Sequence, residues 1–517
     1  MKLKKSSLLI AIIGALTVGA CSPAPNKNSS NSEYSVYSLD DSSTESEPKS
    51  SSESISSPES SSESLAPSSS SEKRDSSSSS EEKYSIPKEG YFKRNITVQL
   101  EPGLRKNGDS TPYNLSFAYD DEYFLSDNTV YNKHLSMLSF AVTLATAKKE
   151  KGMSFFNGIG FKDIIPYSYD VPTTADTMGY FIAHRKIDDF ELISIGFRGF
   201  NYGNEWANNF KIGLTTNHQG FEERASQVFV DLVSYIKNYC SNGKIKLWIN
   251  GYSRGGAVAN SFINYISHIS SFAVGPSDIY VYTFEAPASI GEHYDTACPY
   301  VHNVTNDADL ITFIPPQSYG LRRFGIDHQI YDSNISTLMK EFDPAVDIPD
   351  FKELPSMEPP VMNDIEFRAK VINLVFNRPE LADDVAANTR EQYVNNYQDG
   401  LGAMIGYIFS LSEATRSALL KDLSDLGLGA LSILGDSTGE SFANFLKTYL
   451  DKDNVQYSEE TFVSECAVMV KGIQNLFFVL LLGYVSGELT EDLTRLIDMH
   501  FPETTYVLLL NAHKSME

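Results

Sequence analysis

The chain has 517 residues, which is room for one large domain or for two to three ordinary ones. Its formal net charge of −25 argues against nucleic acids and other polyanions as partners. The four cysteines lack the spacing of metal ligands, so we expect neither a disulfide framework nor a zinc site.

Residues 1–21 have the features of a targeting segment. Three lysines within the first five residues precede an apolar run, Leu8–Val18, that is too short to span a membrane comfortably. The run ends in small residues directly before Cys21, so it resembles a bacterial lipoprotein signal peptide with Cys21 as the lipidated residue. An uncleaved anchor is the alternative. We therefore expect an exported protein, tethered to the bacterial cell membrane by acyl chains on Cys21.

Residues 22–88 are dominated by Ser, Glu and Pro and contain almost no apolar side chains. Such a segment cannot bury enough surface to offset the entropy lost on ordering, so we predict a disordered, stalk-like linker. A flexible chain of this length has a root-mean-square reach of about 45 Å. That reach would hold a domain clear of the membrane.

Residues 89–334 alternate between strand and helix patterns. Expected strands are Tyr91–Leu100, Thr177–His184, Glu191–Phe197, Lys244–Asn250, Asp278–Phe284 and Tyr300–Val304, and expected helices are Leu135–Lys148, Glu222–Tyr239 and Ala257–Ile269. Strands that alternate with helices predict an α/β fold with a mostly parallel, doubly wound sheet.

A G-x-S-x-G sequence, Gly251-Tyr252-Ser253-Arg254-Gly255, joins one of these strands to the helix that follows it. Strand, tight turn and helix are the context of a nucleophile elbow, in which the serine hydroxyl is exposed at the top of the sheet. Glycines on either side of Ser253 let the strand and helix approach closely. A structural turn that matches by chance is the alternative to a nucleophile.

Residues 335–490 form a long insertion with helical periodicity. Helices are expected at Glu366–Phe376, Glu391–Leu411, Ala414–Leu434, Phe442–Leu450 and Phe462–Val485. The apolar stretch Leu476–Leu482 favours a buried or substrate-facing helix over a membrane span. We interpret the insertion as a helical cap over the site, after which residues 491–517 return to the core.

Several sequence blocks resemble those of the class 3 lipases, in the same order and with similar spacing. The resemblance is specific over residues 177–330 and resumes at His500-Phe501-Pro502-Glu503 and Tyr506, which look like the closing motif of a bacterial lipoprotein branch. The blocks are Phe197-Arg198-Gly199, His218-x-Gly220-Phe221, Gly251–Gly256, Thr283-Phe284-x-x-Pro287 and Asp309-Leu310-Ile311 with Pro315-Pro316.

The resemblance implies an α/β-hydrolase fold and a serine nucleophile, with two departures from the family pattern. The residue after Phe-Arg-Gly is usually Thr or Ser in this family, and here it is Phe200. The segment that forms the lid lies between Trp206 and His218, which is too short for a large lid helix.

The three residues of a catalytic triad follow the order Ser, acid, His in α/β-hydrolases. After Ser253, Asp309 lies in the loop position that matches the family motif, with Asp307 as the fallback. His500 stands at an element boundary before Pro502, where a loop can present it, and His328 is the next candidate. Serine needs the imidazole to remove its proton, and the imidazole needs the carboxylate to fix its tautomer.

The oxyanion hole in this architecture is formed by two backbone N–H groups. We expect them to be those of Arg254, directly after the nucleophile, and of Phe200, which cannot add the hydroxyl that Thr would supply. The alternative for the Arg198 side chain is a purely structural role, as the ion-pair partner of an acid such as Glu205.

The sequence thus predicts a membrane-tethered, exported serine hydrolase that cleaves carboxylic esters, most simply lipid acyl esters. It would need no metal and no cofactor, and no obligate protein partner is evident. The alternative is a catalytically inactive α/β-hydrolase scaffold that serves as a surface binding module. A third hypothesis keeps the chemistry and changes the substrate to a peptide or a cell-wall acyl group.

Overall fold

The computed structural model describes residues 92–101, 112–335, 338, 390–426, 433, 436–470 and 499–514, with short gaps at 201–202, 241–242, 271, 293–297, 310, 316 and 397. All of these residues belong to the same compact unit of the chain. The predicted signal peptide with Cys21, the predicted linker and the expected helix Glu366–Phe376 lie outside the described residues.

A seven-stranded sheet runs in the order β11-β9-β7-β6-β5-β4-β3. The strands from β5 to β11 are parallel, and β3 and β4 are antiparallel at one edge. The prediction of a mostly parallel sheet is therefore confirmed. The strands are β3 (Lys162–Tyr167), β4 (Tyr180–Ile187), β5 (Phe190–Phe197), β6 (Lys244–Tyr252), β7 (Ile279–Phe284), β9 (Val301–Thr305) and β11 (Ile326–Gln329).

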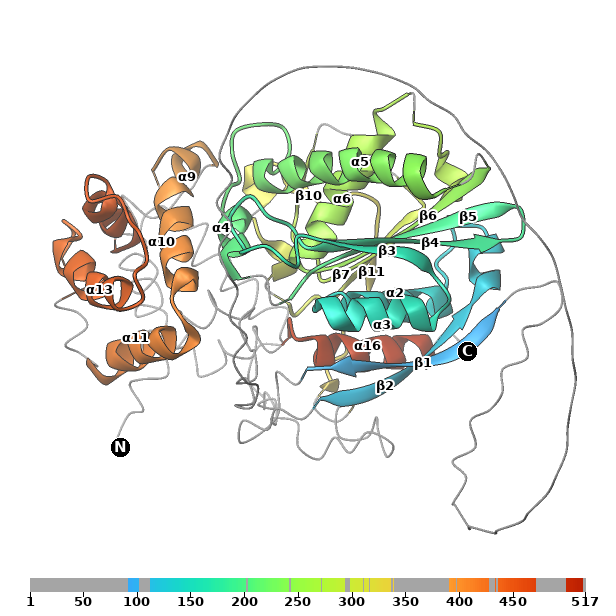
Figure 1. Ribbon diagram of the computed structural model, residues 1–517, viewed down its shortest axis with the longest axis horizontal. Helices are drawn as coiled ribbons and strands as arrows, with labels where there is room; N and C mark the ends of the chain where they lie inside the picture. The colour runs from blue at the N-terminus through green and yellow to red at the C-terminus, as the bar shows by residue number, and fades with distance from the viewer. Residues whose placement is uncertain are drawn as a thin grey trace, which may run out of the picture. The chain divides into compact units, whose positions relative to one another are not determined.

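Helices cover both faces of this sheet, as expected for a doubly wound fold (Figure 1). One face carries α5 (Gln219–Tyr239) and α6 (Arg254–Ser267). The other carries α2 (Lys133–Ala145), α3 (Lys149–Gly158) and the C-terminal α16 (Pro502–Lys514). The apolar residues of α16 thus share one core with those of α2 and α3.

The alternation of side chains along β6 divides the core into two layers. Leu247 and Ile249 point to the side of α5 and α6, while Trp248 and Tyr252 point to the side of α2 and α16. Successive side chains of a strand face opposite sides, so a central strand needs apolar residues at nearly every position. The indole N–H of Trp248 donates to Ser139 Oγ of α2 at 2.8 Å, which satisfies the one polar atom of this buried ring.

Short elements surround the sheet. An antiparallel ribbon of β1 and β2 buries one face against the α2 side, in keeping with the alternating burial of β2. Its strands and the remaining short elements are β1 (Lys93–Leu100), β2 (Tyr113–Asp120), β8 (Ile290–Gly291), β10 (Leu321–Arg322), α4 (Trp206–Asn209), and the 3₁₀ turns Asp121–Leu125, Gly203–Glu205, Pro276–Asp278, Ile311–Phe313 and Gln317–Tyr319.

The described part of the insertion is helical and has a core of its own. The core is formed by apolar residues that include Leu446, Leu450, Phe462 and Val470. The described helices are α9 (Arg390–Asn396), α10 (Gln398–Ser410), α11 (Glu413–Leu426) and α13 (Glu440–Lys452), with residues 462–470 also helical. The first two lie within the expected helix Glu391–Leu411, apart from Arg390.

No helix in the described ranges is both long and apolar enough to cross a bilayer. The apolar stretch Leu476–Leu482 lies outside those ranges, so its assignment as a buried helix stays a prediction. The domain boundaries drawn from the sequence also stay predictions.

Candidate active site

Ser253 lies in the turn between β6 and α6 with φ 50° and ψ −123°. Residues with a Cβ rarely adopt this backbone, and strained residues of this kind cluster at functional sites. A Cβ on Gly251 would lie 2.2 Å from the Gly255 carbonyl oxygen, and a Cβ on Gly255 would lie 2.9 Å from that of Phe197. The turn can therefore be this tight only because glycine stands at both positions.

His500 lies between Ser253 and Asp309. Its Nε2 is 2.7 Å from Ser253 Oγ, and its Nδ1 is 2.6 Å from Asp309 Oδ2. An ionised carboxylate can only accept, so Nδ1–H donates to Asp309 and Nε2 is left to accept from the serine hydroxyl. The contacts join residues 247 and 191 positions apart, so only the tertiary structure brings them together.

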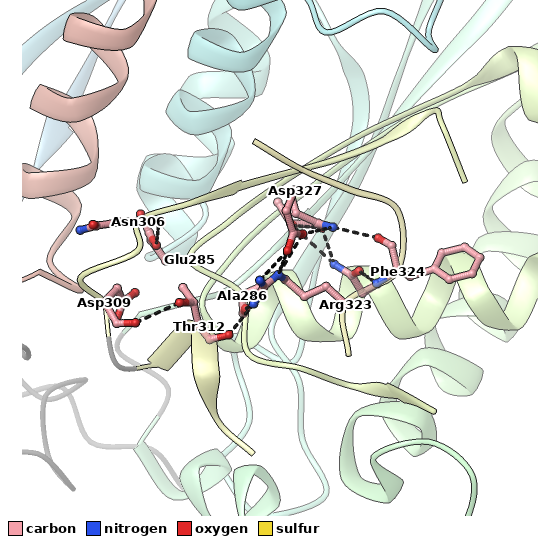
Figure 2. Close-up of polar contacts among 11 residues, drawn as sticks. Glu285, Ala286, Asn306, Asp309, Thr312, Arg323, Phe324 and Asp327 are labelled. Carbon is pink, nitrogen blue, oxygen red and sulfur yellow. Dashed lines mark hydrogen bonds and ion pairs between the residues drawn. The ribbon is translucent and has the colours of Figure 1, made fainter. Parts of the chain in front are cut away.

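Asp309 is fully buried at the end of the loop after β9. Its Oδ1 accepts the Ile311 amide at 2.8 Å, and the Thr312 hydroxyl donates to its carbonyl oxygen at 2.9 Å (Figure 2). Asp307 is half-buried, and the carboxylate in contact with His500 is that of Asp309. Of the two acids that the sequence left open, the structure places Asp309 against the imidazole.

The same loop is braced from behind by Arg323. Its Nη1 donates to the carbonyl oxygen of Ala286 at 3.2 Å and also to that of Thr312, while its Nη2 pairs with Asp327 at 2.6 Å (Figure 2). These bonds join the loop after β7 to the loop after β9. The backbone that follows Asp309 is thereby tied to the loop after β7.

The backbone around His500 is also held from several elements. The Tyr252 hydroxyl donates to the His500 carbonyl oxygen at 2.9 Å and lies 2.8 Å from Thr505 Oγ1 of α16. Asn306 Nδ2 donates to the Met499 carbonyl oxygen at 3.3 Å. The imidazole therefore stands on a short segment anchored to β6, to the acid loop and to α16.

The other histidine candidate, His328, lies elsewhere. Its Nε2 is 2.9 Å from His302 Nδ1, and its ring lies 4.3 Å from that of Tyr131. Tyr131 also lies 2.9 Å from His513 Nε2. The structure thus places His328 in a packed cluster of rings and leaves His500 beside the serine.

The two residues predicted to form the oxyanion hole flank the elbow. Arg254 is the first residue of α6, where the helix dipole favours negative charge. A Cβ on Gly199 would lie 2.3 Å from the Tyr252 carbonyl oxygen, so the segment before Phe200 can pass this close only as glycine. The Phe200 ring lies 4.6 Å from the Tyr252 ring. Their role in oxyanion binding stays a prediction.

A buried ion network links these two segments. Glu205 accepts from Arg198 Nη2 at 2.5 Å and from Arg254 Nη1 at 3.1 Å, and all three side chains are almost completely buried. The sequence suggested the Arg198 contact, but the Arg254 side chain was missed. Its three members come from separate segments, and no spacing in the sequence relates them.

Within the described residues, no group of three or more His, Cys, Asp or Glu side chains is arranged to hold a metal ion.

Comparison with known families identifies the segment that carries this geometry. Residues 194–319 match the family model described as Lipase (class 3). This segment is similar to the class 3 lipases. It includes the second half of β5, the elbow, Asp309 and both predicted oxyanion residues, whereas His500 lies beyond it. The enzyme class is that of the carboxylic ester hydrolases.

Solved structures of fungal lipases show a distant likeness to this chain. The triacylglyceride lipase of Rhizomucor miehei has 16% identity and a TM-score of 0.30, over 44% of this chain and 97% of that one. Lipase II from Rhizopus niveus has 16% identity and a TM-score of 0.31, over 39% and 82%. No curated protein matches. Values this low support no statement about substrate.

Proposed function

We propose that this protein is an exported serine hydrolase that cleaves carboxylic esters through Ser253, His500 and Asp309. The observation that carries the proposal is the hydrogen-bonded chain from Ser253 Oγ through the imidazole to Asp309 Oδ2. The class 3 lipase match over residues 194–319 supports the same reaction class.

The reaction follows from the direction of these hydrogen bonds. Ser253 Oγ attacks the ester carbonyl carbon as its proton passes to His500 Nε2, and Asp309 stabilises the imidazolium that forms. The backbone N–H groups of Phe200 and Arg254 would bind the oxyanion. Collapse of the tetrahedral intermediate breaks the bond to the alcohol, which leaves with the proton from His500. Water then releases the acid from the acyl-enzyme by the same steps.

Lipid acyl esters are the substrate class that we propose. The support is the family match, because class 3 lipases act on such esters, together with a predicted tether that would hold the enzyme at a membrane. A series of p-nitrophenyl esters of increasing chain length, measured against an amide substrate, tests this class. A higher kcat/KM for the amide than for any of the esters would favour a peptide or cell-wall acyl substrate.

A fluorophosphonate probe tests the central claim, because it reacts only with an activated serine. We expect stoichiometric labelling of the wild type and none of Ser253→Ala, with both proteins melting at the same temperature. Replacement of Ser267, at the end of α6, by Ala is a matched control that should be labelled fully. An unlabelled wild type would favour the alternative function, an inactive scaffold for binding.

We further propose that the enzyme is anchored through acyl chains on Cys21, on the basis of the sequence alone. Each buried CH₂ of an acyl chain contributes about 0.8 kcal/mol to membrane binding. Cys21→Ser should therefore move the protein from the detergent phase to the aqueous phase in a detergent-partition experiment. Retention of the variant in the detergent phase would indicate an uncleaved helical anchor.

A further inference from the structure

Glu285 is a buried carboxyl in the loop that follows β7. Its side chain is completely shielded from solvent, and its φ is 48°. Glycine would adopt this left-handed backbone without steric cost, whereas a residue with a Cβ is strained there. Because this strained position holds a buried acid and not glycine, we infer that the side chain has a function.

The carboxyl of Glu285 lies behind the proposed catalytic acid. It is close enough to Asp309 for the two side chains to hydrogen-bond. Glu285 Oε2 accepts the Asn306 amide at 2.9 Å, and Oε1 accepts the Thr505 hydroxyl at 3.2 Å (Figure 2 shows the loop). The Glu285 carboxyl therefore contacts both the loop that carries Asp309 and the helix that follows His500.

Two carboxyl groups that share a hydrogen bond must also share a proton, because an ionised carboxylate has no donor. Asp309 accepts two hydrogen bonds, from Nδ1–H of His500 and from the Ile311 amide. Accepting from two donors is what an ionised carboxylate does, so Asp309 is the ionised member of the pair. Glu285 is then the member that holds the proton. Burial and the neighbouring Asp309 raise the pKa of the Glu285 carboxyl well above its ordinary value.

We propose that Glu285 is a positioning residue, whose protonated carboxyl donates a hydrogen bond to Asp309 and so fixes the acid that orients His500. The inference rests on the proposed function. The pair carries one negative charge, held by three donors, which are Glu285, Ile311 and His500. Asp309 thus keeps its charge and its rotamer in a site without solvent.

The charged and titratable groups around Glu285 are consistent with a neutral acid. Asp309 lies beside Glu285 and contacts His500, and the Tyr252 hydroxyl is within electrostatic range of Glu285, Asp309 and Glu503. Arg323 binds the carbonyl oxygen of Ala286, the residue after Glu285, and pairs with Asp327. Among the described residues, no basic side chain forms an ion pair with Glu285, which an ionised Glu285 would need.

Infrared spectroscopy tests the protonation state directly. The difference spectrum between wild type and Glu285→Gln at neutral pH should contain the C=O stretch of a protonated carboxyl. Glu191→Gln is the matched control. Glu191 is also a buried acid, but it lies near the start of β5 and pairs with His184. A lost carboxylate band at Glu285 would overturn the proposal.

Kinetics on a soluble ester test the positioning role. Glu285→Leu, of similar volume and equal backbone strain, removes the donor and should lower kcat about 10- to 100-fold with little change in KM. Glu285→Gln keeps a donor for Asp309 and should recover most of this loss. Equal kcat values for the two variants would contradict the role. If the Leu variant does not fold, the infrared comparison still tests whether Glu285 is protonated.

These results are distinguishable from a failure of the proposed function. Fluorophosphonate labelling of wild-type Ser253 reports the nucleophile, whatever the state of Glu285. A labelled wild type without the protonated-carboxyl band would refute the inference alone. An unlabelled wild type would refute the proposed function.

Discussion

At the scale of single residues, the site depends on side chains that act as a unit. Ser253 supplies the hydroxyl, His500 faces it at 2.7 Å, and Asp309 fixes the tautomer of the imidazole. Loss of any one member of such a unit removes most of the benefit of the others, so their mutational effects do not add.

His500→Ala should therefore lower kcat by about 10⁴-fold or more, and Ser253→Ala with His500→Ala should be no slower than either single variant. His328→Ala is the matched control, since that ring packs against His302 and Tyr131. Its kcat/KM on a soluble ester should stay near that of the wild type. The opposite ranking of the two histidine variants would transfer the general base to β11.

At the scale of elements, the insertion is docked on the loop between α4 and α5. Arg390 of α9 donates to the carbonyl oxygens of Gly213 at 2.7 Å and of Asn217 at 2.7 Å. Gln398 of α10 accepts the Gly213 amide at 2.7 Å. This loop belongs to the segment between Trp206 and His218 that was too short for a large lid helix. The docked helices α9 and α10 therefore cover a region that the sequence assigned to a short lid.

Arg390→Ala should loosen this docking without unfolding the core, because it leaves backbone carbonyls that water can reach. We expect faster hydrogen–deuterium exchange in α9, α10 and residues 212–217, and unchanged fluorophosphonate labelling of Ser253. Lys452→Ala, at the end of α13, is the matched control and should leave all of these rates unchanged. Unchanged exchange in Arg390→Ala would show that the Gln398 hydrogen bond and apolar contacts hold the insertion without Arg390.

At the scale of the whole molecule, several buried histidines make the fold sensitive to acid. Burial lowers the pKa of His302 to about 4, that of His513 to about 4 and that of His218 to about 3. An unfolded chain binds these protons near pH 6.5. Between these pKa values the unfolded state binds protons that the folded state does not bind, so the free energy of unfolding falls as the pH falls.

The free energy of unfolding should therefore be highest above about pH 6.5 and should decline as the pH falls toward 4. Each histidine contributes about 1.4 kcal/mol for every unit between its two pKa values. Urea denaturation across this range measures the slope. His302→Gln should flatten it, whereas the matched variant of the exposed His268, at the end of α6, should not. Equal slopes in the two variants would assign the acid sensitivity to other groups.

The sequence by itself determined the local features of this protein. Apolar periodicity gave most of the central strands and the helices α2, α5 and α6, whereas β2, β3, β11 and α3 were not predicted. The strand, turn and helix around Ser253 followed from the glycines on either side of it. These features depend on residues a few positions apart, where spacing translates directly into geometry. The mostly parallel sheet followed from the alternation of such elements.

Only the tertiary structure decided which distant side chains meet. It placed Asp309 rather than Asp307, and His500 rather than His328, against the serine site, across separations of 191 and 247 residues. It also set Glu285 behind Asp309 and joined Arg198 and Arg254 through Glu205. The physical reason is that parallel strands collect at one edge the loops that follow them, and no periodicity within a segment records which loops become neighbours.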